Sequence, residues 1–201
     1  MKLWHCKQAR SLRAVWALEE MAIEYELETL PFPPRFMQPE YLEVNPLGTV
    51  PFLVDGDTTM TESIAICHYL AEKYHKDDFT LKPDHPEYGD YLNWLYHGDA
   101  TLTFPQTIFL RYAMLESEEN RQPKVADDYR KWYLKRLIRL NKHIVGREFL
   151  CGQRFTIADI AITYALFLGK MIGIDADYES QVKDYLDRMT SRPGFIQANG
   201  K

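Results

Sequence analysis

The stretch 45–74, NPLGTVPFLVDGDTTMTESIAICHYLAEKY, decides the fold because it combines a turn, two short strands and the start of a helix. Pro46 and Gly48 predict the turn, since proline fixes φ and glycine allows positive φ. The apolar runs 51–54 and 58–61 follow, and the Asp-Gly pair between them is a strong signal for a β-hairpin. The centre of this stretch is therefore predicted to be a turn followed by a hairpin.

A helix is predicted to begin at Glu62-Ser63, because apolar residues recur at helical spacing from Ile64 to Tyr74. Backbone N–H groups at a helix start attract a carboxylate, the hydroxyl of Ser63 adds a donor, and Glu62 suits an ammonium group. Together these groups fit the head group of an α-amino acid. The alternative interpretation is a plain helix cap by Thr61 or Ser63.

The residues before the first strand predict a second binding feature. We expect the Val50–Pro51 peptide bond to be cis, which leaves the N–H and C=O groups of Val50 unpaired and ready to bind an extended peptide. The pattern N-P-x-G-x-V-P, followed by E-S at the next helix start, resembles the glutathione-binding half of the cytosolic glutathione S-transferases. The resemblance covers the rest of the chain as well.

This resemblance implies a set of binding residues for glutathione as co-substrate, with no metal. In the family, the residue before the cis-proline pairs with the cysteinyl backbone of glutathione, and an acidic residue with a serine holds the γ-glutamyl group. The corresponding positions here are Val50, Pro51, Glu62 and Ser63. The resemblance also implies a symmetric homodimer, and the rigid apolar segment 31–36 is expected to wall the cleft or to pack on the partner subunit.

Composition limits the alternatives. With 201 residues and 46% hydrophobic content, the chain is long enough for one or two globular domains. A net charge of −5 with mixed charges along the helices argues against nucleic acid as a partner. Without a signal-peptide pattern or an apolar run of about 18 residues, a cytoplasmic protein is expected, with no membrane partner. Three widely spaced cysteines argue against a disulfide framework or a zinc cluster.

The remaining elements predict a fold of two parts, α/β and then all-α. Strands are expected at 2–6 and 25–30, with a helix at 11–22 between them, which gives the strand and helix order of a thioredoxin-like domain. The charged, proline-containing segment 76–87 is interpreted as a linker. We therefore predict a thioredoxin-like glutathione-binding domain at 1–77 and an all-helical domain at 86–201.

The helical part contains a recognisable cap. A long helix is expected from Tyr88, ended or kinked at Pro105, and another at 129–145. Within Phe155-Thr156-Ile157-Ala158-Asp159-Ile160, Thr156 is placed to cap a helix and Asp159 to reach back to it, with a hydrophobic staple around them. Capping accounts fully for these residues, so Asp159 is assigned to the fold and not to a site.

A glutathione transferase must present the ligand thiol as a thiolate. A thiol with a pKa near 8.5 is only about 3% ionised at pH 7, so full ionisation raises the nucleophile concentration about 30-fold. The start of the first helix favours the anion through its dipole, and Arg10 and Ser11 stand there. The segment ARSLRAVWALEE also resembles S-R-S-x-R-x-x-W-x-L-E-E of microbial relatives, in which the serine after the arginine lies near the sulfur. We therefore predict Ser11, then Arg10, as catalytic, with a plain N-cap as the alternative for Ser11.

Other residues at the N-terminus leave alternatives open. Where other classes carry an early tyrosine, this chain has Trp4 and His5, and His5 is either a core histidine or a general base. Cys6 lacks the second cysteine of a C-x-x-C pair, which excludes a dithiol mechanism. A mixed disulfide of Cys6 with glutathione remains an alternative function, as does a non-catalytic binding or regulatory protein of this fold. Cys67 is predicted to be core.

The second substrate is predicted to be a small hydrophobic electrophile. Tyr96, Thr103, Phe104 and Tyr112 of the helical domain are the candidates for an apolar wall around it. Aromatic residues at helical spacing are also typical of a core. No residue in the sequence identifies the electrophile.

Overall fold

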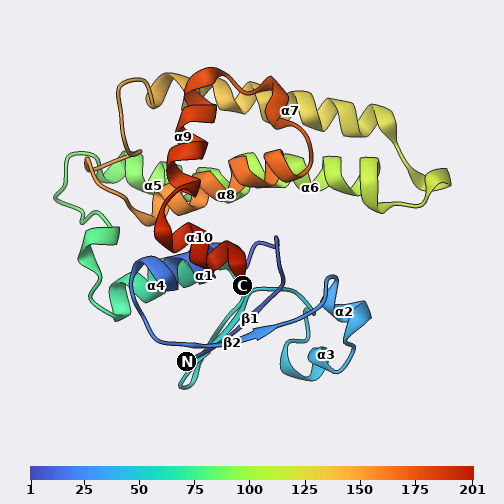
Figure 1. Ribbon diagram of the computed structural model, residues 1–201, viewed down its shortest axis with the longest axis horizontal. Helices are drawn as coiled ribbons and strands as arrows, with labels where there is room; N and C mark the ends of the chain where they lie inside the picture. The colour runs from blue at the N-terminus through green and yellow to red at the C-terminus, as the bar shows by residue number, and fades with distance from the viewer. The chain divides into compact units, whose positions relative to one another are not determined.

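The computed structural model describes residues 1–201, and its contacts divide the chain into two compact units (Figure 1). The first unit comprises Met1–Thr80 together with Thr190–Lys201, and the second comprises Leu81–Met189. The domain boundaries expected from the sequence, 1–77 and 86–201, stay a prediction. They differ from the units mainly in the C-terminal segment, which the sequence assigned to the helical part.

The first unit contains a four-stranded mixed sheet in the order β2-β1-β3-β4. Its strands are β1 (Lys2–His5), β2 (Glu26–Thr29), β3 (Phe52–Asp55) and β4 (Thr58–Met60). Strand β1 pairs in parallel with β2 and antiparallel with β3, and β3 pairs antiparallel with β4. The predicted hairpin is therefore present, and the thioredoxin-like order is confirmed.

Three longer helices complete the first unit: α1 (Leu12–Glu20), α4 (Ser63–Lys73) and α10 (Pro193–Gly200). Helices α1 and α4 contact each other, and α10 packs along α1 (Figure 1). Three short helices lie in the connections: α2 (Pro34–Met37), α3 (Tyr41–Val44) and η1 (Asp77–Phe79). The sequence pattern predicted neither α2 nor α3, because one turn of helix carries no detectable periodicity.

The contact between α10 and α1 explains why the C-terminal segment belongs to the first unit. Phe195 meets the ring of Trp16 edge-on, with centroids 5.0 Å apart. Arg192 donates two hydrogen bonds to the carboxylate of Glu20, each 2.8 Å long. At Gly194 a Cβ atom would lie only 2.7 Å from the Glu20 side chain, so glycine allows this approach. Helix α10 thus covers α1, in which every residue from Leu12 to Leu18 is buried.

The second unit is helical, as predicted. It contains α5 (Tyr88–Tyr96), η2 (His97–Thr103), α6 (Phe104–Leu110), η3 (Arg111–Leu115), η4 (Glu118–Asn120), α7 (Pro123–His143), α8 (Ile157–Met171), η5 (Asp175–Asp177) and α9 (Ser180–Thr190). Segments η2 and η3 are π-helical. Pro105 stands in the first turn of α6, directly after η2, so the chain continues helically through a π segment and does not end there. None of the helices combines the length and apolar content that a membrane span needs.

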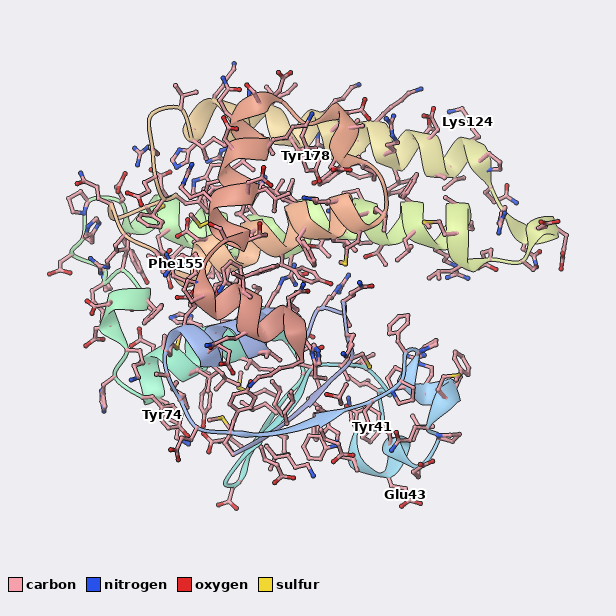
Figure 2. The ribbon with its side chains drawn as sticks, viewed as in Figure 1. Tyr41, Glu43, Tyr74, Lys124, Phe155 and Tyr178 are labelled. Atoms are coloured by element: carbon pink, nitrogen blue, oxygen red, sulfur yellow. The ribbon has the colours of Figure 1, made fainter.

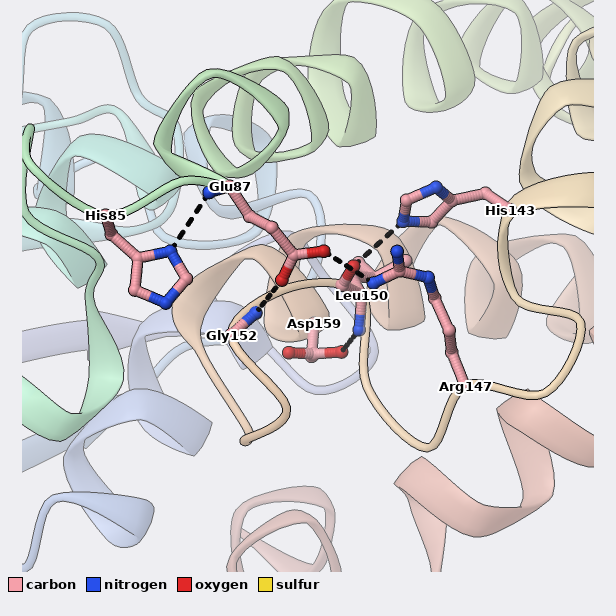
Figure 3. Close-up of polar contacts among 7 residues, drawn as sticks. All are labelled: His85, Glu87, His143, Arg147, Leu150, Gly152 and Asp159. Carbon is pink, nitrogen blue, oxygen red and sulfur yellow. Dashed lines mark hydrogen bonds and ion pairs between the residues drawn. The ribbon is translucent and has the colours of Figure 1, made fainter.

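The loop between α7 and α8 is held by side chains that Figure 3 shows in close-up. Glu87 accepts a hydrogen bond from Nη1 of Arg147 and another from the backbone N–H of Gly152, both 2.7 Å long. The backbone N–H of Leu150 donates to Oδ1 of Asp159 at 3.0 Å. These bonds fix the approach to α8, where the predicted capping box of Thr156 and Asp159 is present.

Candidate functional site

The turn before the first hairpin strand is held rigidly by its own side chains. Asn45 is buried, and its Oδ1 accepts a hydrogen bond from the backbone N–H of Leu47 at 3.2 Å. The carbonyl oxygen of Thr49 accepts bonds from Nδ2 of Asn45 and from the hydroxyl of Tyr41, both 2.9 Å long. Tyr41 is labelled in Figure 2. Gly48 has a φ of 58°, a backbone angle that residues with a side chain rarely adopt. The residue that follows the turn, Val50, therefore starts from a fixed position.

Val50 and Pro51 link this turn to strand β3. The peptide bond between them is cis, as is that between Phe32 and Pro33. The sheet register begins only at Phe52, and no backbone hydrogen bond in the structure uses the N–H or C=O group of Val50. The residue is half-buried, so its polar backbone groups remain available to an incoming chain.

The start of α4 has no side-chain cap. Glu62 is exposed and has extended backbone angles at the N-cap position, and the hydrogen bond from Ile66 N–H to its carbonyl oxygen is the first of the helix. Ser63 is 6% exposed, and its Oγ accepts a hydrogen bond from Nη1 of Arg13 at 3.0 Å. The backbone N–H groups of this first turn have no intrahelical acceptor, as at any helix start. The arrangement suits an anion.

Arg13 lies in the segment ARSLRAVWALEE, but the sequence pattern assigned it no function. Its side chain is fully buried, and it lies on α1, whereas its acceptor Ser63 lies fifty residues further along the chain. A cation within the apolar run LRAVWAL is the one local signal that marked it, because arginine is almost never fully buried unless paired. The pairing itself depends on the packing of α1 against α4, which no local pattern contains.

The start of α1 differs from the prediction for Ser11. The residue is fully buried, and its hydroxyl caps no backbone N–H group of the helix. Instead Oγ lies 2.8 Å from Nδ1 of His5, accepts a bond from the N–H of Cys6 at 3.2 Å, and lies 3.3 Å from the Cys6 carbonyl oxygen. These contacts tie the end of β1 to the start of α1. Neither the plain cap nor a hydroxyl exposed to a ligand describes Ser11 in this structure.

His5 and Cys6 lie in the interior beside Ser11. Burial, and to a smaller extent the charge of Lys7, lowers the pKa of His5 to about 4, so its ring is neutral at pH 7. Burial raises the pKa of Cys6 to about 11, and its thiol faces the carbonyl oxygen of Pro31 at 3.7 Å. Both residues are at most 1% exposed. His5 is thus a core histidine, and Cys6 is a buried thiol.

Arg10 and Cys67, the two remaining candidates near α1, differ in burial. Arg10 is half-buried at the start of α1, the most accessible of the predicted sulfur-activating groups. Cys67 is fully buried on α4, and its thiol donates to the carbonyl oxygen of Arg13 at 3.4 Å. Burial raises the pKa of Cys67 to about 12, in keeping with its predicted place in the core.

The four candidates for the electrophile wall differ in accessibility. Tyr96 and Phe104 are exposed, and Tyr112 is half-buried. Thr103 is fully buried, and its hydroxyl donates to the carbonyl oxygen of Gly98 at 2.7 Å, within the π-helical segment η2. Its hydroxyl is therefore used in a hydrogen bond to the backbone, and the side chain does not line an open surface. We keep Tyr96, Phe104 and Tyr112 as candidates and remove Thr103.

Comparison with protein families gives two matches in chain order. Residues 9–73 match the model of the glutathione S-transferase N-terminal domain, and residues 102–193 match that of the glutathione S-transferase C-terminal domain. The first match contains Arg10, Val50, Glu62 and Ser63. The curated protein glutathione S-transferase 3 of Schizosaccharomyces pombe is 26% identical over 204 residues, covering 95% of this chain and 83% of that protein.

Solved structures give the same result for the fold. A sphingomonad glutathione S-transferase in complex with glutathione is 26% identical, with a TM-score of 0.82, and the match covers 100% of this chain and 98% of that chain. A ternary complex of BphK, a bacterial glutathione S-transferase, has a TM-score of 0.86 at 23% identity, with the same coverage. The second likeness concerns the fold alone.

Proposed function

This chain belongs to the glutathione S-transferase family, and from that premise we propose that it transfers the thiolate of glutathione to a small hydrophobic electrophile. The observation that carries the proposal is the start of α4, where a helix end without a side-chain cap meets a serine hydroxyl held by a buried arginine. Such an end attracts a carboxylate. Glutathione in the complex of the sphingomonad relative supports the choice of ligand.

In this proposal the γ-glutamyl head group binds at the start of α4. Its carboxylate accepts hydrogen bonds from the hydroxyl of Ser63 and from the N–H groups of the first turn, and its ammonium group pairs with Glu62. The near-complete burial of Ser63 and the exposure of Glu62 support this division, because a carboxylate gains more from partly desolvated donors than from water-exposed ones. The cysteinyl unit pairs with the free backbone groups of Val50, beside Pro51.

The thiol then lies at the start of α1, where an anion is favoured. A helix dipole contributes about 0.3–1 kcal/mol, and a charge-assisted hydrogen bond from a guanidinium adds to it. We now rank Arg10 ahead of Ser11 as the residue that stabilises the thiolate. Arg10 is half-buried, whereas Ser11 is fully buried. Ser11 then acts by holding the loop that carries Arg10.

The alternative reaction through Cys6 receives no support. A mixed disulfide with glutathione requires an accessible thiolate, and Cys6 is fully buried with its pKa raised to about 11. Mass spectrometry after treatment with oxidised glutathione measures this directly, and we expect no adduct on Cys6. A non-catalytic relative of the fold would bind glutathione without turning over any electrophile.

The experiment that tests the proposed function combines binding with turnover. We expect glutathione to bind in calorimetry, and a panel of electrophiles (aryl halides, epoxides, enals and organic peroxides) to contain at least one substrate that is consumed with glutathione. Binding without turnover across the panel would favour the non-catalytic reading. Phe104→Ala and Tyr96→Ala are expected to raise KM for the electrophile and to leave glutathione affinity unchanged.

We also propose that the protein forms a homodimer. Phe32, Phe36 and Met37 are 58%, 74% and 62% exposed, an apolar group of a kind that protein interfaces cover. Sedimentation at micromolar concentration is expected to give twice the 23.7 kDa mass of the chain. Phe36→Asp is expected to shift the equilibrium toward the monomer.

A further inference from the structure

The buried guanidinium of Arg13 is the charged group that the proposed reaction leaves unexplained. It is fully buried in the first unit, on the helix α1 that contacts α4. Moving a guanidinium out of water is costly, and an arginine is almost never fully buried unless its charge is paired or hydrogen-bonded. One contact gives that role a direction, the 3.0 Å hydrogen bond from Nη1 to Oγ of Ser63.

The chemistry of the two groups decides how the Ser63 hydroxyl is oriented. A guanidinium has only donors, whereas a hydroxyl has one donor and two acceptor lone pairs. Ser63 must therefore accept from Arg13, and its own proton is left to point to another acceptor. The hydroxyl thus becomes the middle member of a chain that runs from a cation through a neutral hydroxyl to an external acceptor. Such chains strengthen each member by polarisation.

We propose that Arg13 is a positioning residue that makes the start of α4 selective for a carboxylate, by fixing and polarising the hydroxyl of Ser63. The inference rests on the proposed function, because the carboxylate is that of the γ-glutamyl group. Arg13 does not touch the ligand. It acts through Ser63 and through its positive charge, which lies one hydroxyl away from the positive end of the α4 dipole.

Carboxylate selectivity follows from this arrangement. A neutral amide in place of the carboxylate still accepts a hydrogen bond from the Ser63 hydroxyl, but it gains little from a buried cation behind that hydroxyl. A carboxylate gains both contributions, because hydrogen bonds involving a charged group are about twice as strong as neutral ones. Loss of Arg13 should therefore weaken binding of the carboxylate ligand far more than binding of its amide.

A purely structural role for Arg13 makes a different prediction. The backbone carbonyl of Arg13 accepts the bond from the Cys67 thiol, and this contact between α1 and α4 survives any substitution of the side chain. If the guanidinium served only the packing of the two helices, its removal would lower stability and weaken both ligands equally. The ratio of the two affinities therefore separates positioning from packing.

The test uses Arg13→Met, which keeps the length of the side chain and removes the charge, with Arg136→Met as control. Arg136 is exposed on α7 and lies 5.3 Å from the centroid of the Trp132 ring, so its loss removes the same charge from the second unit. Calorimetry measures glutathione and the analogue whose glutamyl α-carboxylate is an amide. We expect Arg13→Met to weaken glutathione about 10- to 100-fold and the amide by less than about threefold.

Two further measurements complete the design. In a double-mutant cycle, Ser63→Ala with Arg13→Met should bind glutathione about as weakly as the weaker single variant, since both act through one hydroxyl. At saturating glutathione, kcat should change by less than about twofold while KM for glutathione rises, as for uniform binding. Arg136→Met should match the wild type in each of these measurements.

Arg13→Lys keeps the test decisive if Arg13→Met does not fold, because it retains the charge in a shape that does not match the guanidinium. We expect it to weaken glutathione by at least about threefold while retaining preference for the carboxylate. Wild-type affinity in Arg13→Lys, or equal weakening of both ligands in Arg13→Met, would overturn the inference about Arg13 and leave the proposed function intact. A wild-type protein that does not bind glutathione would overturn the proposed function and this inference with it.

Discussion

The starts of α4 and α8 use similar residues and differ in what satisfies them. At α8, the carboxylate of Asp159 accepts bonds from Thr156 N–H at 2.9 Å, from Leu150 N–H at 3.0 Å and from the hydroxyl of Tyr185 at 2.8 Å. At α4, no side chain caps the helix, and the one hydroxyl present is held from behind by Arg13. The protein's own groups therefore satisfy the start of α8 and leave the start of α4 open.

This difference separates stability from binding. A good N-cap contributes about 0.5–2 kcal/mol to stability, so an open helix start forgoes that amount until a ligand supplies the missing acceptor. A serine, threonine or aspartate at a helix start therefore does not by itself indicate a site. The distinguishing feature is whether the protein's own groups already satisfy the end. Substitutions of Asp159 at the start of α8 and of Glu62 at the start of α4 test this distinction.

The largest effect is expected at the closed end. Asp159→Ala leaves the N–H groups of Leu150 and Thr156 and the Tyr185 hydroxyl without their acceptor, and we expect a loss of about 3–5 kcal/mol in the free energy of unfolding. Urea unfolding measures it, with exposed Asp184→Ala on α9 as control. Glutathione affinity of the folded fraction should not change. A loss below about 1 kcal/mol would show that this cap contributes little.

The second prediction concerns acid stability and His5. Because burial lowers the folded-state pKa from 6.5 to about 4, the unfolded chain takes up the proton first. The stability contribution is fully present above about pH 6.5 and is lost as the pH falls toward about 4, by at most about 3 kcal/mol. His5→Asn should lack this part of the pH dependence. Identical pH profiles for the two proteins would contradict the buried, neutral state of His5.

The third prediction concerns Ser11. Ser11→Ala leaves the Cys6 N–H and the His5 ring without their partner, so we expect a loss of about 1–3 kcal/mol in unfolding free energy. Turnover should fall only to the extent that the substitution displaces the loop carrying Arg10. Ser11→Cys keeps a polar atom at the same place and should therefore recover part of the stability. A stable Ser11→Ala protein with strongly reduced kcat would instead indicate that Ser11 interacts directly with the glutathione sulfur.

The smallest effect is expected at Glu62, which is exposed at the open end of α4. An ion pair screened by water contributes little, so Glu62→Gln should weaken glutathione by about 0.5–1 kcal/mol and leave stability unchanged. The loss should shrink further at high salt. Exposed Glu43→Gln on α3 is the matched control. A larger, salt-independent loss would mean that the bound ligand shields Glu62 from solvent.

Local patterns predicted much of this molecule. The hairpin followed from an Asp-Gly pair, the α8 cap from the spacing of Thr156 and Asp159, and the start of α4 from the return of helical periodicity after Ser63. In each case the information lies within a few residues. The same locality explains why short helices α2 and α3 were missed.

What the sequence did not predict depends on packing over long separations. Arg13 meets Ser63 across fifty positions, and Arg192 meets Glu20 across most of the chain. The direction of the Ser11 hydroxyl was missed for a related reason. A serine before a helix predicts a cap, but the buried ring of His5 offers a competing partner that only the fold brings within 2.8 Å.

The most direct test of the open and closed helix ends compares Ser63→Ala with Thr156→Ala. Both remove one hydroxyl from a helix start, and both are measured by calorimetric glutathione binding and by urea unfolding. We expect Ser63→Ala to weaken glutathione by about 1–3 kcal/mol, and also to lower stability, because the buried guanidinium of Arg13 loses an acceptor. Thr156→Ala should lower stability by about 0.5–2 kcal/mol with unchanged affinity. Unchanged glutathione affinity in Ser63→Ala would show that both helix starts serve the fold alone.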